Sequence, residues 1–146
     1  MNIKQSNKGF SLVELAIGLA VITVLILAIS MSSGIRDTAR VQSAVNSIQA
    51  LRSAAESYLA SGKINYSGMD VAALKTNNLL PTNFNATGTN PWGGNYAVAP
   101  NATPTKYDIT LGSVAAADST KLTSYYNNLA NTSAYDATAK TWTVTF

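Results

Sequence analysis

One acidic residue lies at the start of a long uncharged, apolar stretch near the beginning of this 146-residue chain. No residue from 15 to 35 carries a charged side chain, and Glu14 directly precedes them. At about 1.5 Å per residue this stretch makes roughly 30 Å of helix, enough to cross the hydrocarbon core of a bilayer. An ionised group in such a helix is costly unless a partner neutralises it, which makes Glu14 a candidate functional residue.

A cut between Gly9 and Phe10 would create a positive partner for this acid. Lys8 and Gly9 end a short, basic, polar leader, and Phe10 begins the apolar segment. The new amine would lie about one helical turn from Glu14, which is the fifth residue counted from Phe10. At about 4 Å and an effective dielectric near 20, such an ion pair is worth about 4 kcal/mol.

The run G-F-S-L-V-E at residues 9–14 resembles the processing and methylation signature of type IV prepilins and of type II secretion pseudopilins. The resemblance implies that a membrane-embedded prepilin peptidase cuts after Gly9 and methylates the amine of Phe10, which stays charged. It also implies that Glu14 pairs with the N-terminal amine of a neighbouring subunit during filament assembly.

Two other interpretations of this region are open. The first is a conventional secretory signal peptide with Lys4 and Lys8 as its charged end and cleavage near residues 28–30. Three features argue against a signal peptide: the acid inside the apolar core, the length of the apolar run, and a helical pattern that continues past the cleavage position. The second is a simple membrane anchor, which leaves Glu14 and the junction before Phe10 without a role.

Composition argues against an enzyme and against a nucleic-acid-binding protein. Charged residues make up 12% of the chain, and it contains no His and no Cys. No catalytic residue set or phosphate loop is visible, and we expect no cofactor. Loss of Lys4 and Lys8 with the leader leaves eight basic and seven acidic side chains, so no strongly basic surface is indicated. Three acids lack calcium-loop spacing, and we interpret them as solvated turn or cap residues and expect no metal: Asp108, Asp118 and Asp136.

Helical periodicity continues beyond the apolar stretch and predicts one helix over residues 10–61, about 80 Å long. Its second half carries an apolar face of Val41, Val45, Ile48, Leu51, Ala55, Tyr58 and Leu59, and Gly62 is a good stop. Such a helix is too long for its first half to be buried in a domain of this size. The first half must pack in lipid or in an assembly.

The remaining residues predict a small head. A short helix is expected at 69–76, with Ser67 and Asp70 at capping-box spacing, and Leu79 and Leu80 tether the following loop to the core. Pro91, Gly93 and Gly94 predict a tight turn in which Trp92 covers the core. Alternating residues predict a hairpin, whose strands carry Tyr96 and Val98 and then Tyr107, Ile109 and Leu111. Alternation also predicts a final strand with Trp142, Val144 and Phe146. One helix is expected between the last two strands, with a face of Leu122, Tyr125, Tyr126 and Leu129.

The predicted fold is therefore α+β and pilin-like, with a long N-terminal helix packed against a small antiparallel sheet. The expected parts are a leader at 1–9, a membrane and assembly segment at 10–35, the amphipathic half of the helix at 36–61 and a globular head at 62–146. Whether the chain resembles the type IVa or the type IVb and conjugative branch stays open.

By this resemblance the chain is the major subunit of a type IV pilus, held in the bacterial inner membrane by one helix and then assembled into an extracellular filament. The implied partners are identical subunits, the prepilin peptidase, the inner-membrane assembly machinery and the membrane. A pseudopilin of a type II secretion system and a minor or adhesin-bearing pilin are the alternatives.

Overall fold

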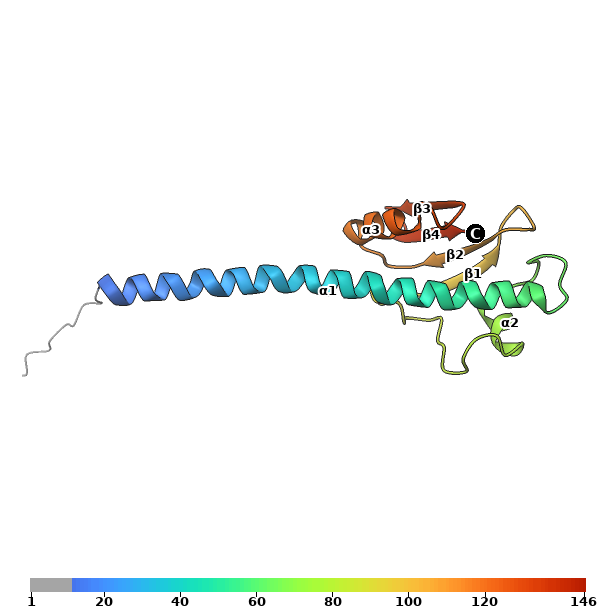
Figure 1. Ribbon diagram of the computed structural model, residues 1–146, viewed down its shortest axis with the longest axis horizontal. Coiled ribbons are helices and arrows are strands. Elements are labelled where there is room, and N and C mark those ends of the chain that lie inside the picture. Colours follow the sequence, from blue (N-terminus) through green and yellow to red (C-terminus); the bar gives the residue numbers. More distant parts are fainter. Residues whose placement is uncertain (1–11) are drawn as a thin grey trace, which may run out of the picture. The chain divides into compact units, whose positions relative to one another are not determined.

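The computed structural model describes residues 12–146, apart from the side chains of residues 28–33. Three helices and four strands follow one another in these residues (Figure 1): α1 (Leu12–Ala60), α2 (Val71–Thr76), β1 (Tyr96–Pro100), β2 (Tyr107–Leu111), α3 (Ala116–Tyr126), β3 (Thr132–Asp136) and β4 (Thr141–Thr145). The chain divides into two units, Met1–Arg36 and Asp37–Phe146, to both of which α1 contributes. We call the described part of the first the helical unit and the second the head.

The helical unit consists of the first half of α1. Leu and Ala favour a helix here, and no Pro interrupts it. Glu14 lies in the first turn, where the partial positive charge of the helix terminus favours an acid. The predicted long helix is confirmed over the described residues, whereas its first two residues, 10 and 11, lie outside them.

The second half of α1 contributes its apolar face to the core of the head. Five residues of its predicted apolar face are at most 5% exposed: Val45, Ile48, Leu51, Ala55 and Tyr58. The other two, Val41 and Leu59, are partly buried against the core. The helix ends at Ala60, and Gly62 follows with a φ of 94°, a conformation that glycine adopts without a steric penalty. The predicted stop is therefore confirmed.

The sheet is antiparallel throughout and has the strand order β1-β2-β4-β3 (Figure 1). The hairpin of β1 and β2 was expected, and Val98 lies opposite Ile109 in it. The prediction of only three strands is wrong, because β3 forms a fourth at the sheet edge and α3 connects β2 to β3. Side chains of β3 alternate between exposed and half-buried, so its sequence lacks the apolar alternation that marks the other strands.

One hydrophobic core joins α1, the sheet and α3. Its largest fully buried residue is Trp142 of β4, whose indole nitrogen donates to Thr123 Oγ1 of α3 at 3.0 Å. Tyr126 packs beside this indole, with the ring centroids 5.6 Å apart and the ring planes tilted by 47°. The predicted α+β, pilin-like fold is thus confirmed.

The short helix α2 begins at Val71, two residues later than expected, and its cap differs from the prediction. Asp70 is the N-cap, since its Oδ1 accepts from the backbone N–H of Ala73 at 2.6 Å. Ser67 lies outside the helix, so the predicted capping box is wrong. The predicted tether is confirmed, because Leu80 is buried in the core and Leu79 packs against it.

The turn before β1 is built around Asn90, which is 4% exposed. Its Oδ1 accepts from the backbone N–H groups of Trp92 at 3.0 Å and Gly94 at 2.8 Å, and its Nδ2 donates to the carbonyl of Gly112 at 2.6 Å. A side chain at Gly94 would collide with that same carbonyl. The predicted tight turn is confirmed, and Asn90 ties it to the residue that follows β2.

Candidate assembly surface

The three residues predicted to act in processing and assembly divide between described and undescribed parts of the chain. Gly9 and Phe10 lie outside the described residues. Glu14 is in the first turn of α1 and is exposed. The structure therefore describes one side of the predicted ion pair.

The surface around and after Glu14 is largely apolar on every side of the helix. Its large side chains are between 53% and 84% exposed in the single chain, and they are Leu12, Val13, Leu15, Ile17, Leu19, Val21, Ile22, Val24, Leu25, Ile26 and Leu27. Apolar surface costs about 25 cal/mol per Å² when it faces water. A surface of this extent therefore requires a cover that is not water.

Two shallow hollows interrupt this surface. The first, of about 410 Å³, is lined by Glu14, Leu15, Gly18, Leu19 and Ile22. The second, of about 280 Å³, is lined by Ala20, Val21, Val24 and Leu25. Both arise where a small residue lies between larger ones, and such places let another helix approach closely.

The predicted membrane segment is described only in part, since residues 10 and 11 and the side chains of residues 28–33 lie outside the described residues. Among the residues that the structure describes, no helix is apolar over a length sufficient to cross a membrane. The single-pass membrane stage stays a prediction.

Two family models match the chain. One, described as Bundlin, matches residues 33–146. The chain belongs to the bundlin family of pilins. The other, described as a prokaryotic N-terminal methylation motif, matches residues 4–30. No curated protein and no solved structure matches the chain.

These two matches cover complementary parts of the pilin. The bundlin match includes the whole head, and the match to the methylation motif includes Gly9, Phe10 and Glu14. Together they make the chain a type IV pilin-like subunit of a structural family. The motif further implies that the chain is a substrate of the prepilin peptidase, and that it is anchored in the membrane before it enters a pilus.

The three acids considered for metal binding lie apart in the head. No group of three or more possible ligands occurs within the described part of the chain. Asp136 is exposed and accepts from the backbone N–H of Thr138 at 2.8 Å, as a turn residue does. Asp108 is half-buried within β2 and accepts from Thr145 Oγ1 of β4 at 2.6 Å, so its interpretation as a turn or cap residue is wrong. These two acids stabilise the head locally.

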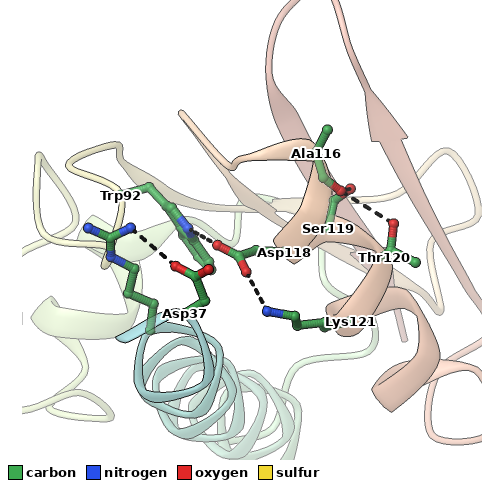
Figure 2. A network of polar contacts seen from close by, with 8 residues as sticks. Asp37, Trp92, Ala116, Asp118, Ser119, Thr120 and Lys121 are labelled. Carbon is green, nitrogen blue, oxygen red and sulfur yellow. Dashed lines mark hydrogen bonds and ion pairs between the residues drawn. The ribbon is translucent and has the colours of Figure 1, made fainter. Parts of the chain in front are cut away.

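The interpretation of Asp118 as a solvated residue is wrong, because it is 3% exposed. Figure 2 shows its two oxygens accepting from Trp92 Nε1 at 2.9 Å and from Lys121 Nζ at 3.1 Å. Trp92 therefore covers the core as predicted, and its indole N–H also fixes the first turn of α3. The sequence held two signals for this contact: the spacing of Asp118 and Lys121, and the need of an indole N–H that packs on the core for an acceptor.

Buried tyrosines account for much of the head's aromatic content. Tyr58, Tyr96, Tyr107 and Tyr126 are all at most 5% exposed, as the sequence predicts. Desolvation by burial raises the pKa of Tyr107 and of Tyr126 well above the ordinary tyrosine value. Both stay neutral at physiological pH, so they act as packing residues of the pilin head.

Proposed function

We propose that this pilin is the major subunit of a type IV pilus. It is held in the inner membrane by its apolar helix, cut after Gly9, methylated on Phe10, and then packed into a filament. In that filament the helical units lie inside and the heads outside. Glu14 sets the axial register by accepting the charged amine of a neighbouring subunit's Phe10.

The observation that carries this proposal is the exposed apolar surface of the helical unit, in a chain whose head matches the bundlin family. A lipid environment and a bundle of identical helices both keep this surface from water, so the same residues serve both stages. About 800 Å² kept from water is worth roughly 20 kcal/mol before the costs of association are subtracted. A subunit left alone in water would aggregate.

The single acid adds specificity to an otherwise uniform apolar surface. Apolar contacts between helices have little preference for one axial register over another, because sliding exchanges one aliphatic side chain for the next. An ion pair between Glu14 and a terminal amine exists in one register only. At an effective dielectric near 20 and a separation of about 4 Å, it favours that register by about 4 kcal/mol.

Sheared surface filaments provide the test. We expect electron microscopy to show long filaments, and mass spectrometry to identify this chain as their main protein, beginning at N-methylated Phe10. Filaments in which the chain is rare would assign it as a minor or adhesin-bearing pilin. The absence of long filaments, together with impaired secretion of exoproteins on deletion of the gene, would assign it as a pseudopilin.

A further inference from the structure

The larger hollow of the helical unit owes its existence to one glycine beside the acid. Glu14, Gly18 and Ile22 follow one another at intervals of four, so they lie above one another on one face of α1. Gly18 is the only member of this row without a side chain. A Cβ added there would meet no heavy atom within 4 Å, which leaves the space above it open.

The lining of the hollow defines the chemistry of a fitting occupant. Glu14 lies at one end of the hollow, and the aliphatic side chains of Leu15, Leu19 and Ile22 line the rest. An occupant that complements both parts carries a cation at one end and a compact apolar group next to it. The hollow of about 410 Å³ has room for an aromatic ring, since an enclosed cavity of about 150 Å³ accepts benzene.

The processed N-terminus of a second copy has both features on one residue. Cleavage after Gly9 leaves a charged amine on Phe10, and three bonds of about 1.5 Å separate that nitrogen from the phenyl ring, or about 4 Å in space. Along α1 the step from Glu14 to Gly18 is about 6 Å. A residue whose amine contacts the carboxylate can therefore place its ring over the glycine.

We propose that the hollow at Gly18 receives the phenyl ring of Phe10 from a neighbouring subunit while the amine of that residue pairs with Glu14. The inference rests on the proposed function, because it requires a cleaved and assembled subunit. It adds a second contact point to the ion pair. The ion pair alone fixes the distance between one helix and its neighbour's terminus. The ion pair and the buried ring together also fix the direction from which the neighbouring helix approaches.

A second copy fits this hollow better than a membrane lipid, although an ammonium headgroup next to an acyl chain has related chemistry. Every processed subunit supplies one such terminus for each hollow, so occupancy in a filament is stoichiometric. The apolar surface also continues along the same face beyond the hollow, where Leu25 and Ile26 follow Ile22 by three and four residues and are exposed. The rest of the neighbour's helix therefore has a continuous surface on which to pack.

The test fills the hollow and compares it with the same change elsewhere in the helix. Gly18→Leu places an aliphatic side chain where the ring would lie, and we expect sheared filaments to decrease roughly tenfold or more because the ring loses its burial. Gly34→Leu is the control, since it gives the same gain in helix propensity at a glycine that also has open space around it. Both variants should be cleaved and methylated normally, as judged by mass spectrometry of the membrane fraction.

A compensating change makes the test specific for the ring. Phe10→Ala alone should reduce filaments, and Gly18→Leu with Phe10→Ala should assemble better than either single variant, because the leucine then fills the hollow itself. Normal assembly of Gly18→Leu, or no recovery in the double variant, would overturn the proposal. If Glu14→Ala abolishes filaments while Gly18→Leu does not, the proposed function stands and only the ring assignment fails.

A photoreactive benzophenone amino acid at Ile22 gives a readout that does not depend on yield. In sheared filaments it should cross-link to the peptide that begins at residue 10 of another subunit. Cross-links to phospholipid, or only to peptides from other parts of the chain, would contradict the assignment.

Discussion

Two leucines of the same helix summarise the difference between the two units of this pilin. Leu51 in the head is fully buried, whereas Leu19 in the helical unit is 60% exposed. Both lie in regular α-helix, so local conformation does not distinguish them. In the head, the sheet and α3 supply the partners for the apolar face; in the helical unit, the chain supplies none among the described residues. The head completes its core alone, and the helical unit needs other molecules.

The acids of α1 differ in the same way. Glu56 in the head accepts from Arg52 at 2.8 Å, four residues earlier on the same helix. No basic residue occurs within four positions after Glu14 in the sequence, where Leu15, Ala16, Ile17 and Gly18 follow. The head's acid has its cation within the helix. In our account Glu14 pairs with the terminus of a neighbouring subunit, which is why processing and assembly are coupled.

The largest expected effect separates these two acids. Glu14→Ala should leave cleavage and methylation intact but abolish most filaments, because the axial register loses about 4 kcal/mol per contact. Glu56→Ala is the matched control and should assemble normally, since an exposed pair of this spacing contributes about 0.3–0.5 kcal/mol. Counting filaments by electron microscopy tests both, and normal piliation in Glu14→Ala would refute the assigned role.

Truncating a large apolar residue should affect the two units in opposite ways. Trp142→Ala should destabilise the head by about 3–5 kcal/mol, because it leaves a cavity in the centre of the core. Leu19→Ala should change the unfolding of the head little and reduce filament yield instead. Urea denaturation of the detergent-solubilised pilin, followed by circular dichroism, measures the first effect. Equal losses of stability in both variants would contradict the division of roles.

The same glycine substitution also distinguishes the units. Gly94→Ala should cost about 1–3 kcal/mol or more, since the new methyl group collides with the Gly112 carbonyl and displaces the turn around Asn90. Gly34→Ala should be neutral or stabilise the helix by up to about 1 kcal/mol. Urea midpoints of the two variants give the comparison. A neutral Gly94→Ala would show that the turn can relax.

The smallest effect concerns the cap of α2. Asp70→Ala should destabilise the head by about 1 kcal/mol, because the N–H of Ala73 loses its acceptor. Ser67→Ala is the control and should have almost no effect, since Ser67 lies before the cap. Filament yield should stay unchanged in both. A larger loss from Ser67→Ala would restore the capping box that the sequence predicted.

Patterns that repeat locally allowed most of the fold to be predicted. The apolar face of α1, its stop at Gly62 and the hairpin of β1 and β2 all depend on periodicity or on single turn residues. The edge strand β3 was missed, because its half-exposed side chains carry no apolar alternation. The burial of Asp118 was also missed, because it depends on Trp92, which lies 26 residues earlier in a loop.

The predicted assembly site depends on local signals in the sequence. The position of Glu14 ahead of a long uncharged stretch is a local signal, and so is the junction between Gly9 and Phe10. The hollow could not be predicted from composition, because it depends on Gly18 lying directly above Glu14 on one helix face. A glycine four residues after an isolated acid was the signal available in the sequence.

The most direct test is a disulfide between neighbouring helical units. The chain contains no cysteine, so introduced cysteines can pair only with each other. Pairing of Glu14 with a neighbour's Phe10 shifts adjacent helices by four residues, so Ser11→Cys and Leu15→Cys in one chain should face each other between subunits. Oxidised filaments of this double variant should give a ladder of linked subunits on a non-reducing gel. Ser11→Cys with Leu25→Cys, which this register leaves about 15 Å apart between subunits, should give none. Filaments of the first variant that stay unlinked, or equal ladders in both, would contradict the register on which the account depends.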